Sequence, residues 1–239
     1  MKTKNIMVIG GGSGLGAAIS HAELKKGNNV FILSSKPLNE RIKNAKSLHH
    51  TFFDLKDFDQ DNFLNSFDNL DYKIDKLYFC SIIINYKLFF DITKTNIDNE
   101  IKWNVTAPIA ILQKVLKNNP NTHVIFVLSH ICFLFNRGFL VYRTIKKAME
   151  AFLMGLEIEF PAAKISRVYP GAIDTEFAKN CGYTGLELFK KNDVNKLASY
   201  IVDSKSPTII YRRDLVLKIL NSLVPFSLQK WIYNRLILK

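Results

Sequence analysis

The chain has 239 residues, of which 48% are hydrophobic and 23% are charged, and its formal net charge is +12 at pH 7. This length and apolar content are enough for a sizeable core, which excludes a mainly disordered chain, and 11 glycines and 7 prolines exclude a collagen-like or low-complexity architecture. The positive charge favours anionic partners, namely nucleotides, phosphorylated ligands, acidic membranes or nucleic acid, and does not choose among them.

Short apolar runs alternate with amphipathic stretches from the first residues onward, without an internal repeat or a linker-like stretch. In chain order, the apolar runs predict strands at Asn5–Ile9, Val30–Leu33, Thr51–Phe53, Leu77–Ser81 with an exit at Ile82–Ile84, His123–Leu128, Ile165–Tyr169 and Thr208–Tyr211. The amphipathic stretches predict helices at Leu15–Lys26, Leu38–Ala45, Asp59–Phe67, Ile97–Lys117, Val141–Phe160, and from a cap at Asp193 to Ile201. The alternation predicts one α/β domain over residues 1–239. Its mostly parallel sheet of about seven strands is expected to have helices on both faces and a ligand site at the carboxyl ends of the strands.

Glycines cluster where the first predicted strand turns into the first helix, at Gly10, Gly14 and Gly16. Residues without a Cβ suit so tight a turn, and they allow a phosphate to approach the backbone at the positive end of the helix. No Gly-Lys-Ser/Thr sequence follows, which excludes a nucleoside-triphosphate loop of the Walker type. The cluster therefore predicts a dinucleotide site, and its spacing Gly-x-x-x-Gly-x-Gly is also that of the short-chain dehydrogenase/reductase family.

Later segments resemble the motifs of the same family, in the same order along the chain. Tyr142 and Lys146 match its Tyr-x-x-x-Lys motif, and Ser129 precedes the tyrosine by 13 residues, the usual separation. Asn104 matches the family's catalytic asparagine. The segments that resemble its adenine contact and its nicotinamide border are Phe53-Asp54-Leu55 and Pro170-Gly171-Ala172-Ile173-Asp174-Thr175. The resemblance implies a Rossmann-type, doubly wound fold and an NAD(P)-dependent oxidoreductase that interconverts a carbonyl compound and its alcohol by hydride transfer.

The spacing of Tyr142 and Lys146 has a chemical meaning that does not depend on the family. Residues four apart on a helix share a face, and a nearby ammonium favours the phenolate, which lowers a phenol pKa from about 10 toward the working range. In the same site, Ser129 is expected to donate to the carbonyl oxygen as charge develops there. The family implies that Asn104 holds a water linking Lys146 to solvent, while the nicotinamide supplies the hydride.

The expected cofactor contacts come from the glycine turn and from the ends of several strands. No Asp or Glu stands in Leu33-Ser34-Ser35-Lys36, at the end of the second strand, where an acid would reject a 2′-phosphate. Two hydroxyls and a cation at this place favour NADP(H) over NAD(H). The predicted contacts are Gly10, Gly12, Ser13, Gly14, Leu15, Gly16, Ser34, Ser35, Lys36, Asp54, Leu55, Ser81, Tyr142, Lys146, Pro170, Gly171, Ile173 and Thr175.

Two positions depart from the family pattern. Ile9 replaces the usual threonine before the first glycine, which loses a hydrogen bond of about 1 kcal/mol. Phe79-Cys80-Ser81-Ile82 stands where Asn-Asn-Ala-Gly is usual, so we expect either an altered cofactor wall at Ile82 or a one-residue shift in this placement. This departure keeps an alternative open: a dinucleotide-binding sensor or scaffold of the same fold with little or no turnover. His130, beside Ser129, is expected to be packed or solvated rather than to act as an acid.

Residues 176–192 are the predicted substrate lid, and their apolar and aromatic side chains favour a hydrophobic carbonyl or alcohol substrate. Residues 212–239 form a basic, apolar tail with two interpretations. One is an amphipathic segment that makes peripheral contact with anionic lipid, and the other is a helix that covers the substrate cleft or packs against another subunit. The family's pairing of its long helices implies a homodimer or homotetramer. We expect no nucleic-acid partner, because no recognition module accompanies the charge.

Three scattered cysteines without a Cys-x-x-C pair, and histidines without ligand spacing, predict a reducing compartment and no metal site. No stretch of 18 uncharged apolar residues is present to suggest a membrane span, and the apolar run near residue 5 is too short for a signal peptide. The chain is therefore predicted to be cytoplasmic.

Overall fold

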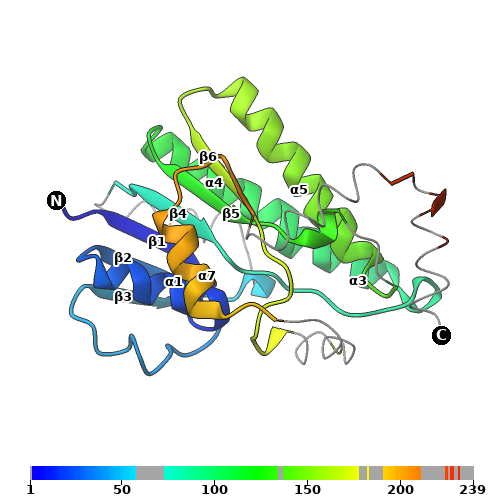
Figure 1. The fold of residues 1–239 in the computed structure, drawn as a ribbon, viewed down its shortest axis with the longest axis horizontal. Coiled ribbons are helices and arrows are strands. Elements are labelled where there is room, and N and C mark those ends of the chain that lie inside the picture. Colours follow the sequence, from blue (N-terminus) through cyan, green and yellow to red (C-terminus); the bar gives the residue numbers. More distant parts are fainter. Residues whose placement is uncertain are drawn as a thin grey trace.

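The computed structural model describes residues 2–57, 73–133, 137–177, 182, 191–210, 224, 225, 227, 228 and 231. In this part of the chain, seven parallel strands form one sheet in the order β3-β2-β1-β4-β5-β6-β7 (Figure 1). The strands are β1 Asn5–Ile9, β2 Asn29–Ser34, β3 Leu48–Phe52, β4 Lys76–Phe79, β5 His123–Val127, β6 Lys164–Tyr169 and β7 Thr208–Ile210. The strand order reverses between β1 and β4, and a crevice at the carboxyl ends of such strands is where these sheets bind ligands.

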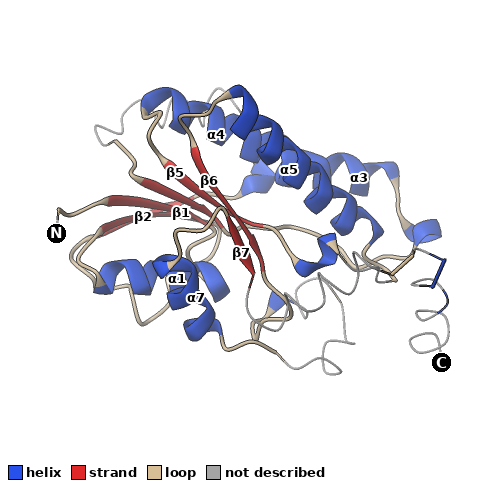
Figure 2. Cartoon of the chain, turned by 45° about the horizontal axis from the view of Figure 1, so that its top comes forward, coloured by secondary structure: helices blue, strands red, loops and turns tan. Residues whose placement is uncertain are grey.

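Helices cover both faces of the sheet, as predicted (Figures 1 and 2). One face carries α1 Gly14–Lys25 and α7 Val194–Asp203. The other face carries α3 Lys94–Ile101, α4 Ala107–Asn118 and α5 Leu140–Glu159. The fold is therefore the expected Rossmann-type α/β arrangement of three layers.

Alternate residues of the buried strands enter two separate cores. Met7 and Ile9 pack in the cluster that contains residues of α4 and α5, whereas Ile6 and Val8 pack with residues of α1 and α7. Because the side chains of a strand alternate between its two faces, a strand covered on both sides needs apolar residues at every position. This is why the sequence of β1 shows an uninterrupted apolar run.

Strand β3 differs from its prediction at both ends. It runs from Leu48 to Phe52 instead of from Thr51 to Phe53, and it pairs with β2 from Val30↔Leu48 to Ser34↔Phe52. It forms an edge of the sheet, and its residues after Leu48 are exposed. The strand therefore lacks the apolar pattern from which the other strands were predicted.

The helix predicted at Leu38–Ala45 is wrong, because this segment forms turns. Asn39 gives one reason: its side-chain oxygen accepts the N–H of Arg41, and its carbonyl accepts the N–H of Ile42 at 3.0 Å. Such local bonds compete with a helical ladder. Ile42 is 1% exposed and Leu38 is half-buried, and both pack in the cluster that contains residues of α1 and α7, so the segment buries its apolar side chains without forming a helix.

The helix predicted at Ile97–Lys117 is present but interrupted. Helix α3 passes into a π-helical turn at Lys102–Thr106 before α4 begins. Pro108 explains the turn, since it has no N–H to donate to the carbonyl of Asn104 and its ring would clash with that carbonyl. The N–H of Ala107 donates to the carbonyl of Lys102 instead. Turns of this kind are frequent at functional sites, and this one carries a predicted site residue.

Strand β1 has its predicted bounds, and the remaining predicted elements that are described have both ends within two residues of their predictions. Asp193 caps α7 as predicted, because its carboxylate accepts the N–H of Lys196 at 2.8 Å. The predicted helix at Asp59–Phe67, most of the lid at 176–192, Tyr211 and most of the tail at 212–239 lie outside the described residues. Among the helices that are described, none is long and apolar enough to cross a membrane.

Candidate active site

The glycine turn between β1 and α1 depends on close backbone contacts. Gly10 has a φ of +80°, and a Cβ there would lie 2.8 Å from the backbone nitrogen of Ser81. A Cβ on Gly16 would overlap the carbonyl oxygen of Gly10, so only glycine lets α1 begin this close to the turn. These two glycines therefore have a steric reason for their spacing.

The first residues of α1 leave the amino end of the helix open. Ser13 and Gly14 are exposed, whereas Leu15 is 8% exposed and anchors the helix in the core. No acidic residue occupies the first turn of α1, so nothing there repels an anion. Gly12 lies against Ser34, since a Cβ on this glycine would meet the serine hydroxyl. Exposed N–H groups at a helix start bind phosphate, and this turn fits the phosphates of a dinucleotide.

The segment after β4, which departs from the family pattern, contacts both the glycine turn and the apolar cluster around Tyr142. Ser81 lies against Gly10, as described above, and the N–H of Cys80 continues the strand pairing by donating to the carbonyl of Ile9 at 2.9 Å. The side chain of Ile82 is half-buried and packs in that apolar cluster. The small Ser81 thus faces the glycine turn, and the branched Ile82 points into the apolar cluster.

At the end of β2, the side chains of the three predicted phosphate contacts differ in how exposed they are. The hydroxyl of Ser34 donates to the carbonyl of Lys36 at 2.8 Å, and this serine is 6% exposed. Ser35 and Lys36 have exposed side chains. His50, on β3, lies with its Nε2 3.1 Å from the Ser34 oxygen. The sequence alone does not place His50 in this site, because only the pairing of β2 with β3 brings it here.

Asp54 and Leu55 follow β3 along the same edge. Asp54 accepts the N–H of Lys56 at 3.0 Å and thereby starts a short 3₁₀ turn at Leu55–Asp57, in which Leu55 is 4% exposed. The N–H of Phe53 donates to the carbonyl of Ser34 at 3.0 Å. This bond keeps the predicted adenine contact beside the end of β2.

Asn104 lies in the π turn and is 5% exposed. Its side-chain oxygen accepts the N–H of Ile83 at 2.9 Å, and its amide donates to the carbonyls of Ile83 at 2.6 Å and Glu100 at 2.8 Å. These bonds tie the helix to the segment that follows β4. The predicted role of Asn104, to hold a water that links Lys146 to solvent, stays a prediction.

Ser129 and Lys146 both lie at the carboxyl end of β5. The Ser129 oxygen accepts a backbone N–H at 3.2 Å, and the residue is 7% exposed. The Lys146 Nζ donates to the carbonyl of Val127 at 2.7 Å, and this lysine is 3% exposed. Its nitrogen lies 5.8 Å from the ring centroid of Phe126 and 5.9 Å from that of Tyr142. Burial lowers the pKa of Lys146 to about 8.

Tyr142 stands one helical turn before Lys146 in α5, with its ring half-buried among apolar side chains. Its centroid lies 5.9 Å from that of Phe139 and 6.0 Å from that of Phe177. The apolar cluster around Tyr142 consists of Ile82, Ile84, Tyr86, Ile131, Phe139 and Phe177. In such surroundings a neighbouring ammonium acts on the phenol more strongly than in water.

The segment 170–175 leaves β6 and reaches the glycine turn. The N–H and Nδ1 of His130 lie 2.9 Å and 3.1 Å from the carbonyl oxygen of Pro170, so this histidine holds the start of the segment beside β5. Gly171 and Ile173 are half-buried. The methyl of Thr175 lies 3.4 Å from the place of a Cβ on Gly14. The segment thus spans the region between β5 and α1, where the resemblance puts the nicotinamide.

Known proteins resemble this chain in sequence and in fold. A family model described as short chain dehydrogenase matches residues 4–184. Among curated proteins, the 3-ketodihydrosphingosine reductase TSC10 of Candida glabrata is 31% identical over 110 residues, which make up 46% of this chain. The chain spans 29% of the length of that relative.

Two solved structures illustrate the likeness of the fold. A short-chain dehydrogenase from Streptomyces avermitilis has a TM-score of 0.78 and 18% identity, over 98% of this chain and 97% of its own. A short chain dehydrogenase from Burkholderia cenocepacia, solved in complex with NADP, has a TM-score of 0.77 and 17% identity, over 99% of this chain and 98% of its own.

Proposed function

The chain belongs to the short-chain dehydrogenase family, and we propose that it is an NAD(P)-dependent oxidoreductase that interconverts a hydrophobic carbonyl compound and its alcohol with NADP(H). One observation carries this proposal: the nitrogen of Lys146 is buried 5.9 Å from the ring of Tyr142, whose surroundings are apolar. A buried amine beside a phenol is the arrangement that prepares a tyrosine for proton transfer.

Each side chain has a distinct task in the proposed reaction. Tyr142 gives its phenolic proton to the carbonyl oxygen during reduction and takes it back during oxidation, while Lys146 lowers the pKa of the phenol. Ser129 donates a hydrogen bond to the same oxygen as negative charge develops. When bound, the nicotinamide cofactor supplies or accepts the hydride. The glycine turn and the segment 170–175 hold that cofactor in place.

Preference for NADP(H) is supported by the end of β2 and its neighbour on β3. The described segment offers no carboxylate to the ribose 2′-hydroxyl, whereas Lys36, Ser35 and His50 are exposed and carry hydrogen-bond donors. Ser34 binds the carbonyl of Lys36 and lies beside His50, so it shapes the edge of this site.

Replacing His50 by alanine is expected to weaken NADPH binding about fivefold and to leave NADH binding within about twofold, because only the 2′-phosphate loses a charged or polar donor. Fluorescence titration of both cofactors measures the change. His49→Ala is the matched control, because this ring stacks on Phe31 at 4.8 Å. An equal loss for both cofactors would refute the role of His50 in selecting the phosphate.

A hydrophobic substrate is supported by the apolar cluster around Tyr142, in which Phe139 and Phe177 both approach the tyrosine ring. The side chains of this cluster are uncharged, so they favour an apolar substrate over a multiply charged sugar phosphate. The Candida glabrata relative is named as a reductase of a 3-keto compound, which is a carbonyl substrate of the proposed kind.

A panel of aldehydes, ketones and quinones, followed by the absorbance of NADPH, tests the proposed reaction. We expect turnover of apolar members of the panel, and we expect it to disappear when Tyr142 is replaced by phenylalanine. Binding of NADPH without turnover of any member would instead favour a dinucleotide-binding sensor or scaffold.

A homodimer or homotetramer formed through the long helices is supported by exposed apolar residues on them. Ile97 and Ile101 on α3 are 39% and 44% exposed, and Met154 and Ile158 on α5 are 53% and 79% exposed. Met149, also on α5, is fully buried in the core of the subunit, so it does not contribute to such a surface.

Peripheral contact with anionic membranes is proposed for the tail at residues 212–239. The sequence from Arg212 onward contains six basic residues and one acidic residue, and Leu228 and Trp231 are 45% and 58% exposed. Deleting residues 226–239 is expected to lower co-sedimentation with anionic vesicles while NADPH binding persists. Unchanged co-sedimentation would favour a tail that covers the cleft or packs against another subunit.

A further inference from the structure

A buried carboxylate lies next to Asn104 and has no task in the proposed reaction. Glu100, in α3, is 2% exposed, and its Oε2 has no hydrogen-bond partner among the described residues. Burial raises the pKa of this carboxyl. An acidic oxygen that is buried without a partner costs folding free energy, so its presence calls for a functional explanation.

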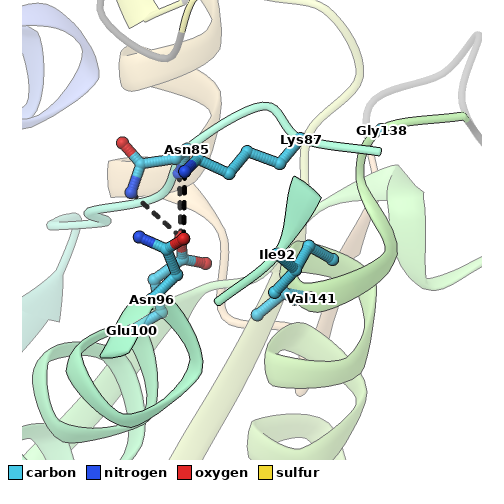
Figure 3. Close-up of a pocket in the computed structure, with 7 residues that line it drawn as sticks. All are labelled: Asn85, Lys87, Ile92, Asn96, Glu100, Gly138 and Val141. Atoms are coloured by element: carbon cyan, nitrogen blue, oxygen red, sulfur yellow. Dashed lines mark hydrogen bonds between the residues drawn. The ribbon is translucent and has the colours of Figure 1, made fainter. Parts of the chain in front are cut away.

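The other oxygen of Glu100 holds the segment that follows β4. Its Oε1 accepts both the backbone N–H and the side-chain amide of Asn85, each at 3.1 Å (Figure 3). Above it, the Nζ of Lys87 donates to Asn96 at 2.9 Å, and its positive charge opposes the rise in the pKa of Glu100. These groups surround a small hollow of about 10 Å³, partly open to solvent and lined by Asn85, Lys87, Ile92, Asn96, Glu100, Gly138 and Val141.

Side chains alternate along the held segment, residues 82–88. Asn85 and Lys87 line the hollow, and Ile83 binds Asn104 through its backbone. The even-numbered residues between them, Ile82, Ile84 and Tyr86, pack in the cluster around Tyr142. In an extended chain successive side chains point to opposite sides. The bonds of Ile83, Asn85 and Lys87 on one side of the segment therefore also hold Ile82, Ile84 and Tyr86, on the other side, against Tyr142.

Tyr86 is held by contacts with the residues just before α5. Its ring lies against Gly138, where a Cβ would overlap it, and Gly138 has a φ of +78°. The ring makes an edge contact with Phe139 at 5.3 Å, and the N–H of Lys87 donates to the carbonyl of Gly138 at 3.1 Å. Residues 82–88 thus contact the chain just before α5, which carries Tyr142.

We propose that Glu100 is a positioning residue that holds residues 82–88 through Asn85 and thereby sets Tyr86 as a wall of the substrate pocket beside Tyr142. A carboxylate suits this task, because both donors of Asn85 converge on one oxygen and charge-assisted hydrogen bonds are roughly twice as strong as neutral ones. Because Tyr142 enters here as the residue that meets the substrate, this role of Glu100 rests on the proposed function.

Hydrogen exchange tests the positioning without any need for turnover. In Glu100→Ala the acceptor is lost, and amides of residues 82–88 are expected to exchange about tenfold faster, while those of β1 do not change. Glu100→Gln keeps an acceptor of the same length and is expected to exchange within about threefold of the unmodified protein. Asn85→Ala removes only the side-chain bond, because residue 85 keeps its backbone N–H, so a smaller increase of about threefold is expected. The double variant should exchange no faster than Glu100→Ala, since both changes act on one interaction.

Steady-state kinetics on the best carbonyl substrate of the panel gives the second readout. We expect KM to rise about tenfold in Glu100→Ala and to be restored by Glu100→Gln, with kcat and the Kd of NADPH within about twofold. Unchanged exchange of residues 82–88 in Glu100→Ala and Asn85→Ala would overturn the role of Glu100. If Glu100→Ala does not fold, the Asn85→Ala variant tests the role of Glu100, because the side chain of Asn85 is exposed and its loss leaves the core intact. Altered exchange in a protein with no turnover on the panel would refute the proposed function and leave the positioning role standing.

Discussion

Replacing Tyr142 by phenylalanine is expected to lower kcat by about 10³, while the Kd of NADPH stays within about threefold. The variant keeps the ring that packs against Phe139 and Phe177 and removes only the hydroxyl. Loss of a positioned acid or base typically costs 10²- to 10⁴-fold in rate. Steady-state kinetics on the best substrate of the panel, with a separate titration of the cofactor, measures both quantities.

Tyr200→Phe is the control for this prediction, because Tyr200 lies on α7 and its hydroxyl is 3.5 Å from the carbonyl of Ile210. Its activity is expected to equal that of the unmodified protein. If Tyr142→Phe kept more than about a tenth of the rate, Tyr142 would not be the group that transfers the proton.

Replacing Lys146 by methionine is expected to lower kcat by about 10² and to increase the free energy of unfolding at pH 7 by about 2 kcal/mol. The rate falls because the phenol of Tyr142 loses its neighbouring charge. Stability rises because Lys146 is 3% exposed and desolvation holds its pKa at about 8, below the ordinary 10.5. Loss of its bond to the Val127 carbonyl offsets part of the gain.

The pH dependence of this gain follows from the sign of the pKa shift. Between about pH 8 and 10.5 the unfolded chain binds one proton more at Lys146 than the folded chain does, so the stability of the unmodified protein rises with pH across this window. The advantage of Lys146→Met is therefore complete below pH 8 and shrinks toward pH 10.5.

Urea unfolding at pH 7 and pH 9.5 measures the difference. Lys147→Met is the control: the neighbouring lysine is exposed and pairs with Glu150 at 2.6 Å, so its loss should change the stability by less than about 0.5 kcal/mol at either pH. An equal stability for Lys146→Met and the unmodified protein at pH 7 would contradict a costly buried amine.

Predictions from sequence were most accurate where the geometry is contained in one element or turn. Gly10 and Gly16 are spaced by the sterics of a single strand-to-helix turn, and the structure shows their contact directly. Tyr142 and Lys146 share a helix face because they are four residues apart, and the ammonium lies near the phenol ring. Such patterns need no knowledge of the rest of the fold.

Errors and omissions occurred where a neighbour in space decided the outcome. The turns at residues 38–45 and the early start of β3 depend on local polar bonds and on pairing with β2, neither of which leaves an apolar pattern. The interruption of the long helix at Asn104 had a local signal in Pro108, which the helical periodicity concealed.

The sequence by itself determined the class of the fold and predicted the groups of the candidate active site, because strand and helix periods, a glycine turn and a helical spacing are properties of short segments. Only the tertiary structure brought His50 to Ser34 and Glu100 to Asn85, at 3.1 Å in each case. Those contacts join residues of different elements, and their distance depends on strand register and on the way a helix lies against a loop. Both are set by the packing of the whole chain, since side chains far apart in sequence meet only after the sheet and its helices have assembled.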